Sequence, residues 1–224
     1  MRYYPVFLDI ADKPVVVIGG GNVALQKVEG LVDAAAQVTV VSPELNEEIQ
    51  KLRDDGKIMH IKRPYQRGDL EGYDLAFVAT DDYEENRRVW QEGRERRIWV
   101  NAVDDIPNCD FIMPGIVRKG DLVVAISTSG TSPAMARKAR EDIEEFLTEE
   151  DAALLDLAAE IRREFKEQGV AVQGCERCGR TNTDVWNAAL DGIVKKLLKE
   201  GDREGAKERV LNLLMAPSGE AAPS

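Results

Sequence analysis

Cysteine and histidine are scarce in this chain of 224 residues, and its 30 lysines and arginines are outnumbered by 41 acidic residues. Three cysteines do not make a disulfide framework. The single histidine, His60, has no carboxylate or second histidine nearby in the sequence and is interpreted as a structural or surface residue. A net charge of −11 argues against nonspecific binding to nucleic acid or to an anionic membrane, because both need a basic surface.

Long apolar runs are also missing. The N-terminus lacks the charged and then apolar layout of a signal peptide, and no stretch approaches the length of a membrane span. We therefore expect a soluble, cytoplasmic protein with a full hydrophobic core. Small, polar and proline-punctuated residues at 216–224 predict a flexible tail.

The most informative stretch is a run of four β-branched residues, 15–18, that leads directly into glycines and then into an amphipathic segment. Gly19-x-Gly21-x-x-Ala24 fits the dinucleotide-binding fingerprint. Gly19 allows a tight turn, Gly21 lets a pyrophosphate approach the backbone, and Ala24 lets the helix pack closely on the strand. The helix N-terminus supplies free N–H groups and partial positive charge. A tight turn without a ligand is the alternative interpretation.

Alternating strands and helices follow this motif. Residues 37–41, 57–62, 74–79 and 97–101 are typical of strands, and helices are expected to about Ala36 and over 44–53 and 82–96. This pattern predicts a Rossmann-type α/β domain with a parallel sheet over residues 1–113. Residues 3–8, which contain Pro5, are expected to form an edge strand or a covering segment.

The residues after the second strand bear on the choice of cofactor. Ser42, Pro43 and Glu44 occupy the position, some twenty residues beyond the fingerprint, where an acid often holds the ribose hydroxyls. Glu44, Glu47 and Glu48 would repel a 2′-phosphate, so NAD is favoured over NADP. The same glutamates also suit the first turn of a helix, and both interpretations can hold together.

Polar residues follow two later strands. Thr80, Asp81 and Asp82 end one strand, and Asp104 and Asp105 follow another. Ligands of open α/β sheets lie beyond the carboxyl ends of the strands, so these residues are expected to face the cofactor. Thr80 and Asp81 are also good N-caps, and a mixed role is expected for this run.

The second half of the chain does not continue the alternation of strands and helices. Residues 111–114 and 115–126 are expected to be strands, the latter a hairpin that turns at 119–121, and Ser132 and Pro133 predict the start of a helix over 134–146. Beyond it, apolar stripes predict three helices in a small bundle: one from Thr148 to Gly169, one that runs past Trp186 to Gly201, and one over about 204–215. We therefore expect three further parts of the chain: a segment at 114–147, a helical domain at 148–215 and the flexible tail at 216–224.

Several motifs, in order, are similar to those of the siroheme synthase N-terminal region, the family of precorrin-2 dehydrogenases and sirohydrochlorin ferrochelatases. The resemblance covers most of the chain through Phe146. It is carried by Tyr4–Leu8, Gly19–Ala24 with Lys27, Ala79–Asp82 with Asn86, Val100–Asp105, Phe111–Pro114, and Ser129–Pro133 with Arg137.

The resemblance implies a homodimer in which the Rossmann domain binds NAD and residues 114–147 form a dimerisation segment. The implied reaction is the oxidation of precorrin-2 to sirohydrochlorin, and ferrous chelation, which some relatives also perform, is left open. Asp104 matches the family's catalytic aspartate. Asn22, Val23, Pro43 and Glu44 match segments that line NAD.

An acidic protein needs a local basic patch to bind the carboxylates of such a substrate. The candidates are Arg118, Lys119, Arg137, Lys138 and Arg140, for each of which a solvated helix or hairpin face is the alternative. Cys175 and Cys178, in a C-x-x-C spacing that departs from the family pattern, are candidate metal ligands. Two reduced thiols in a turn, or a redox pair, are the alternatives.

Two classes of function remain open at the level of the sequence. A dehydrogenase needs Asp104 and a cleft large enough for a tetrapyrrole. An NAD-binding sensor or regulatory module without turnover needs only residues 14–105. The Asp104-Asp105 pair and the second half of the chain favour the enzyme.

Overall fold

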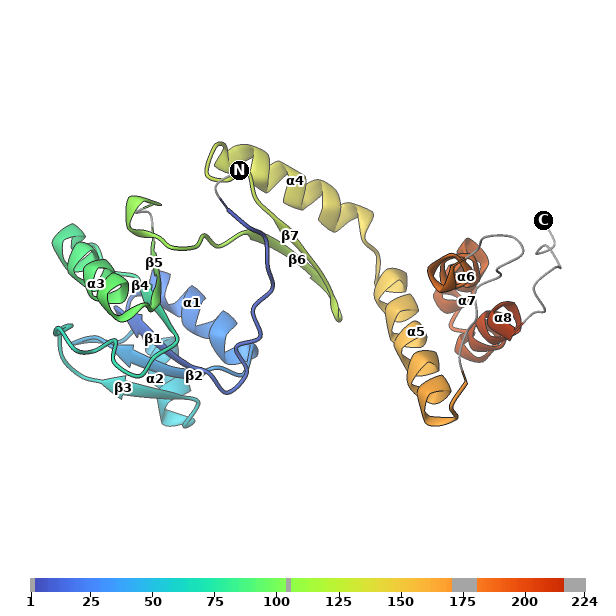
Figure 1. Ribbon diagram of the computed structural model, residues 1–224, viewed down its shortest axis with the longest axis horizontal. Coiled ribbons are helices and arrows are strands. Elements are labelled where there is room, and N and C mark those ends of the chain that lie inside the picture. Colours follow the sequence, from blue (N-terminus) through green and yellow to red (C-terminus); the bar gives the residue numbers. More distant parts are fainter. Residues whose placement is uncertain (1–2, 104–105, 171–180, 216–224) are drawn as a thin grey trace. The chain divides into compact units, whose positions relative to one another are not determined.

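The computed structural model describes residues 3–103, 106–170 and 181–215 and divides the chain into two compact units, Met1–Met113 and Pro114–Ser224 (Figure 1). The first unit is built on a sheet of five parallel strands in the order β3-β2-β1-β4-β5. Their bounds are β1 Pro14–Ile18, β2 Gln37–Val41, β3 Ile58–Ile61, β4 Leu75–Val78 and β5 Trp99–Ala102. The Rossmann-type fold predicted from the sequence is confirmed.

Strand β1 lies at the centre of this sheet because both of its faces are apolar. Val16 pairs with Thr39 of β2 on one side and with Ala76 of β4 on the other. Val15 and Val17 pack against helices α1 (Asn22–Asp33) and α2 (Glu47–Asp54). Val16 and Ile18 pack against α3 (Tyr83–Arg96) and the loop before β4 on the opposite face. Helices on both faces explain the continuous β-branched run.

The helices of the first unit begin later than predicted, and side-chain caps give the reason. Asn46 caps α2, since its side-chain oxygen accepts from Glu48 N at 2.7 Å, so this helix starts at Glu47 rather than at Glu44. Asp82, and not Thr80 or Asp81, caps α3 and accepts from Glu84 N at 2.9 Å. An Asn or Asp cap fixes the first turn by satisfying N–H groups that have no partner within the helix.

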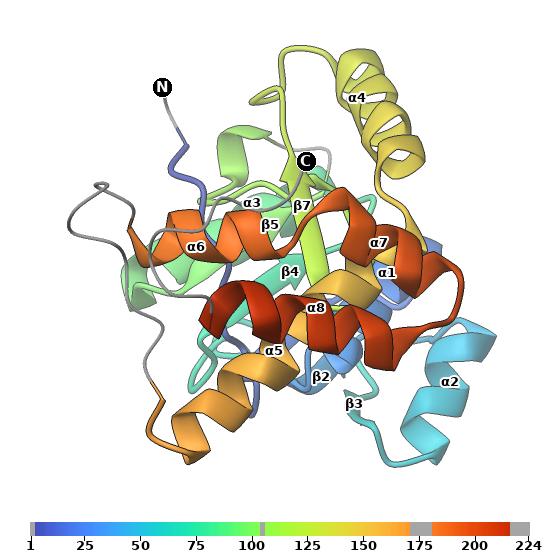
Figure 2. The same cartoon turned by 90° about the vertical axis from the view of Figure 1, so that its right-hand side faces the viewer.

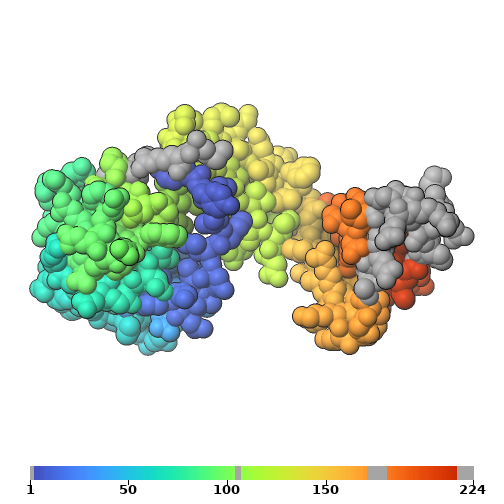
Figure 3. Space-filling model, viewed as in Figure 1, coloured from blue at the N-terminus to red at the C-terminus, as the bar shows by residue number. Residues whose placement is uncertain are grey.

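Residues 3–8, expected to be an edge strand or a covering segment, and residues 111–114, expected to be a strand, do not form strands. Residues 3–8 have no strand partner, and Tyr4 and Phe7 are 87% and 72% exposed (Figure 3, dark blue). Residues 111–114 are also irregular. The side chain of Asn101 donates to Phe111 O at 2.9 Å, so this backbone carbonyl is used by a side chain and not by a neighbouring strand. The Phe111 ring packs edge-on against Phe77, with ring centroids 5.5 Å apart.

The second unit starts with the predicted hairpin. Strands β6 (Gly115–Lys119) and β7 (Leu122–Ile126) are antiparallel, and α4 (Pro133–Phe146) packs against them. Ser132 caps α4 and Pro133 occupies its first turn, as the sequence predicts. No residue of α4 is buried within the described chain; Met135 is 57% and Phe146 is 79% exposed.

The remaining helices enclose a separate core (Figure 2). They are α5 (Glu149–Glu167), α6 (Asn182–Ala189), α7 (Gly192–Lys199) and α8 (Arg203–Met215). The single helix predicted to pass Trp186 is in fact two, because Asp191 accepts from Ile193 N at 3.0 Å and Val194 N at 2.9 Å and so begins a new helix. In the part of the chain that the structure describes, no helix combines the length and the apolar character that crossing a membrane requires.

Candidate cofactor site

The site begins at the glycine loop after β1, where two positions exclude any side chain. Gly19 has φ +111°, and a Cβ there would lie 2.3 Å from Ala79 O. A Cβ on Gly20 would lie 2.1 Å from Glu44 O. The loop thus runs closely between the end of β4 and the segment that follows β2. Only glycine allows this approach.

Gly21 differs from its neighbours because a Cβ there would meet no protein atom within 4 Å. Gly21 is the N-cap of α1 and provides no side-chain cap for the first turn. Ala24, one turn further, is fully buried against the sheet. The result is an uncapped helix N-terminus with open space in front of it, which is an arrangement that binds phosphate groups.

Asn46 holds this loop to the segment after β2. Its backbone N donates to Gly20 O at 2.7 Å and its side-chain amide donates to Asn22 Oδ1 at 2.8 Å, while its side-chain oxygen caps α2. Ser42 is 6% exposed, and its hydroxyl donates to Glu44 O at 2.6 Å. These bonds order the loop before any ligand binds.

The end of β4 forms the next wall. The Thr80 hydroxyl donates to Asn86 Oδ1 at 2.7 Å, and the Asn86 amide donates back to Thr80 O at 3.4 Å. Asn86 is 5% exposed, so this pair fixes the position where the chain leaves the sheet. Thr80 therefore does not cap α3, which was the alternative to a cofactor-facing role, and its hydroxyl instead braces the end of the strand.

A pocket of about 330 Å³ lies at the carboxyl ends of β1, β2 and β4, wholly within the first unit. Of the twelve residues that line it, the sequence predicted six as cofactor-binding, namely Gly19, Gly21, Ser42, Pro43, Thr80 and Asp81. Asn22, Val23 and Glu44, also predicted, are not among the lining residues. No lysine or arginine of the described residues lines the pocket.

Six lining residues were not predicted as cofactor-binding. Gly20, Val41 and Ala79 adjoin predicted residues in the sequence, whereas Pro64 and Tyr65, after β3, and Glu85 of α3 lie in segments that the sequence did not point to. Burial raises the pKa of the Glu85 carboxyl, with a further contribution from Asp82, although Arg88 opposes both. The pocket therefore contains two acidic side chains, Asp81 and Glu85, and lacks a basic one. This makes it a poor site for an additional phosphate.

The end of β5 leads to Asp104, which lies outside the described residues. The chain before it is well fixed, since Val103 N donates to Val78 O at 2.9 Å. Cys109 is buried, and its thiol donates to Ala102 O at 3.0 Å. The segment that carries Asp104 therefore starts at the carboxyl edge of the sheet, the edge at which the glycine loop also lies.

The predicted substrate-binding residues belong to the second unit. Lys119 pairs with Glu149 at 2.9 Å, and Arg140 pairs with Glu144 at 2.5 Å. Arg118, Arg137 and Lys138 are exposed and form no ion pair within the described ranges. These three side chains remain available to an anionic ligand.

The candidate metal ligands Cys175 and Cys178 lie outside the described residues. Among the residues that are described, no group of three or more histidine, cysteine or acidic side chains could hold a metal ion. His60 Nε2 lies 2.9 Å from Ser42 O, which gives this histidine a structural partner next to the pocket.

Comparison with known proteins gives two family matches in succession. Residues 6–115 match a family described as putative NAD(P)-binding, and residues 119–145 match one described as sirohaem biosynthesis protein central. The siroheme synthase of Methylobacillus flagellatus is 36% identical over 96% of this chain, and siroheme synthase 1 of Cronobacter sakazakii is 36% identical over 98%. The chain spans 44% and 45% of those two proteins, less than half of their length.

A solved structure titled SirC, precorrin-2 dehydrogenase, has a similar fold. It aligns over 94% of this chain and 100% of its own length with a TM-score of 0.75, at 22% sequence identity. At that identity the likeness shows the fold.

Proposed function

We propose that this chain is a member of the siroheme synthase family and a precorrin-2 dehydrogenase, because of the family match at residues 119–145 and the likeness to siroheme synthases over most of the chain. It oxidises precorrin-2 to sirohydrochlorin with NAD as hydride acceptor. The observation that carries this proposal is the pocket at the carboxyl ends of β1, β2 and β4, which the glycine loop borders in front of an uncapped helix.

The residues around the pocket suit a dinucleotide. Open space at Gly21 admits a pyrophosphate to the N-terminus of α1, whose first turn includes Asn22 and Val23. Ser42, Pro43 and Glu44 provide the wall after β2, and Thr80 and Asp81 provide the wall after β4. NAD, when bound there, supplies the acceptor for the hydride.

We expect NAD to bind more tightly than NADP. Asp81 and Glu85 line the pocket, no lysine or arginine does, and Glu44 is exposed beside it. A 2′-phosphate would be repelled and would find no cation. Isothermal titration calorimetry with both cofactors measures the difference. Equal or tighter binding of NADP contradicts the charge argument.

Asp104 is the proposed proton acceptor. Forming the new double bond removes two hydrogens from precorrin-2: one leaves as a hydride to NAD, and the other leaves as a proton to the Asp104 carboxylate. One carboxylate near the reacting carbon is sufficient for this step. Asp104 follows β5 by two positions in the sequence, and ligands of such sheets lie beyond the carboxyl ends of the strands, which supports this role.

Substrate binding and assembly are assigned to the second unit. Arg118, Lys119, Arg137 and Arg140 are proposed to bind the carboxylates of the tetrapyrrole, with Arg118 and Arg137 the best placed because no carboxylate of the described chain pairs with them. Residues 114–147 are proposed to form the dimer interface. The exposed apolar side chains of α4 support this, since a second copy would cover them.

A further inference from the structure

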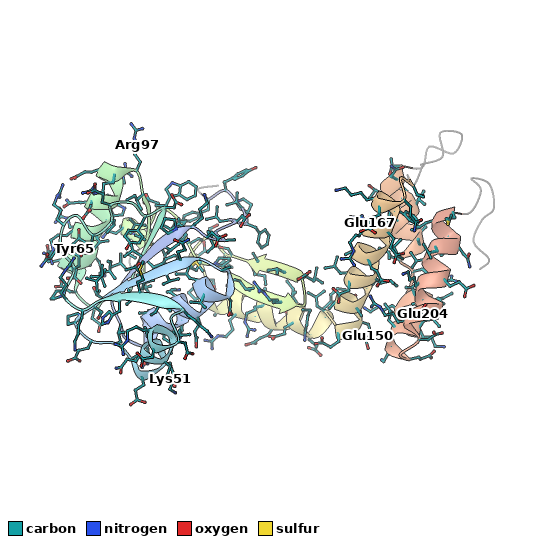
Figure 4. The ribbon with its side chains drawn as sticks, turned by 90° about the horizontal axis from the view of Figure 1, so that it is seen from below. Lys51, Tyr65, Arg97, Glu150, Glu167 and Glu204 are labelled. Atoms are coloured by element: carbon teal, nitrogen blue, oxygen red, sulfur yellow. The ribbon has the colours of Figure 1, made fainter. Side chains whose placement is uncertain are left out.

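Tyr65 lines the pocket from the loop between β3 and β4, residues 62–74 (labelled in Figure 4). Only 6% of the residue is exposed. Its hydroxyl donates to Glu92 Oε2 of α3 at 2.6 Å, a contact between residues that are 27 positions apart. Burial, together with the bond to Glu92, raises the pKa of Tyr65, so the hydroxyl stays protonated and continues to donate.

Glu92 is the buried anchor of this loop. It is 1% exposed and accepts from four groups: the Tyr65 hydroxyl, Gly68 N at 3.0 Å, Leu70 N at 3.4 Å and Arg96 Nε at 2.7 Å. Burial alone would raise the pKa of this carboxyl, but the donated hydrogen bonds outweigh it and lower the pKa below its usual value. A buried carboxylate is tolerated only when it is satisfied in this way.

A second clamp holds the same loop next to Tyr65. Arg63 binds both oxygens of Asp69, at 2.7 and 2.6 Å, and Asp69 also accepts from Gln66 N at 2.8 Å. Arg63 holds the pKa of Asp69 below its usual value. Tyr65 thus stands between two ionic clamps, which fix the position of this residue at the pocket.

The position of Tyr65 identifies the part of the cofactor that it faces. Tyr65 lines the same pocket as Ser42 and Pro43, which directly follow β2. A dinucleotide lies across such a sheet with its pyrophosphate at the helix N-terminus, so its two nucleosides fall on opposite sides. The ribose of the adenosine half is held just after β2 in this fold, so the pocket that Ser42, Pro43 and Tyr65 line is where the adenosine half lies.

We propose that Tyr65 forms a wall of the adenosine subsite and that Glu92 is a positioning residue, which sets affinity for that half of NAD by holding the Tyr65 ring. This inference rests on the proposed function, because it takes NAD as the ligand. It assigns to the loop between β3 and β4 a binding role that the glycine motif does not contain.

ADP-ribose is the probe for this subsite, since it carries the adenosine and the pyrophosphate and lacks nicotinamide. Its Kd is measured by calorimetry for the wild-type chain, Tyr65→Leu, Glu92→Gln and the double variant. Leucine keeps apolar volume at a buried position. Circular dichroism establishes that each variant is folded at the temperature of the titration. Glu71→Gln is the matched control: Glu71 pairs with the same Arg96 at 3.3 Å, whereas the Tyr65 hydroxyl donates to Glu92.

We expect Tyr65→Leu to weaken ADP-ribose binding by about 10-fold, on the scale of one aromatic contact with a base. Glu92→Gln weakens it at least about 3-fold, and adds less than about 2-fold in the Tyr65→Leu background, because its effect passes through the tyrosine ring. Glu71→Gln leaves the Kd within about 2-fold. Should Glu92→Gln not fold, Tyr65→Phe removes the same hydrogen bond, and a weakening of at least about 3-fold is then expected.

Two results overturn the inference and leave the proposed function standing: wild-type binding of ADP-ribose that Tyr65→Leu preserves within about 2-fold, or a Glu92→Gln effect that is undiminished in the double variant. The first removes the adenosine wall and the second removes the positioning role. A wild-type chain that binds neither NAD nor ADP-ribose overturns the inference and the proposed function together.

Discussion

Gly20 and Gly21 are adjacent, yet a methyl group has opposite consequences at the two positions. At Gly20 it would lie 2.1 Å from Glu44 O, whereas at Gly21 it would meet no protein atom within 4 Å. We expect Gly20→Ala to lower the unfolding temperature, because the loop must shift. Gly21→Ala keeps that temperature within about 2 °C but weakens NAD binding at least about 10-fold, by blocking the approach to α1.

Thermal unfolding and calorimetry on the same two variants separate stability from binding. Unchanged NAD affinity in a folded Gly21→Ala protein would show that the space in front of α1 does not receive the pyrophosphate.

Asp104→Asn tests the proton acceptor, since it nearly preserves shape and removes the basic lone pair. The expected result is a loss of turnover of about 10² to 10⁴-fold, the usual contribution of a general base, with NAD affinity unchanged. The rate of NADH formation from precorrin-2 and the Kd of NAD are the two measurements. Turnover close to the wild-type rate would point to Asp105 or to a substrate carboxylate as the base.

Among single residues, the sequence predicts those whose role depends only on the turn or helix that contains them. Gly19, Gly21 and Ala24 act through the turn and helix that they belong to, so their spacing is informative. Tyr65 and Glu92 act through a contact across 27 positions, and a glutamate in a charged helix is read as part of a solvated face. Their pairing depends on how α3 packs against the sheet, which no local pattern contains.

Among the helices and strands, the ends of the helices differ most from the positions that the sequence predicted. The strand runs were recognised because their apolar character extends over whole strands. The break between α6 and α7 was missed because Leu190 and Ile193 keep a helical apolar spacing on either side of Asp191. The side chain of Asp191 determines where the helix breaks, since it both caps α7 and pairs with Arg209 at 2.5 Å.

Asp191→Ala is therefore expected to lower the free energy of unfolding by about 1–2 kcal/mol, the cost of a lost N-cap. Chemical denaturation measures it, with the exposed Asp156→Ala as control, for which the change is within about 0.5 kcal/mol.

Wild type and Asp191→Ala are also expected to differ in how their stability depends on pH. The hydrogen bond from Arg209 lowers the pKa of Asp191 in the folded chain, against the effect of burial. The stabilisation is therefore present above the ordinary aspartate value of about 3.9 and is lost as pH falls through the lower, folded value. The difference in the free energy of unfolding between wild type and Asp191→Ala therefore shrinks as the pH is lowered. If that difference stays constant down to low pH, the Asp191 carboxylate makes no ionic contribution to stability.

For the molecule as a whole, the order of segments could be predicted and the assembly could not. The glycine motif and the strand periodicity define the first unit, and the helical stripes define the core of the second. The proposed homodimer depends on side chains, such as Met135 and Phe146, that the chain leaves exposed. In the proposed dimer a second chain would cover them, and the pattern of one chain does not describe that contact. The metal role of Cys175 and Cys178 stays a prediction for the same reason, since two of four zinc ligands must come from elsewhere.

The central claim is that this chain oxidises precorrin-2 with NAD. Incubation of the purified chain with precorrin-2 and NAD, with NADH and sirohydrochlorin followed together by absorbance, tests it most directly. The account predicts that the two products form in equal amounts and that neither forms when NAD is omitted. Folded protein that binds NAD and leaves precorrin-2 unchanged would contradict the account and would indicate a binding module without turnover.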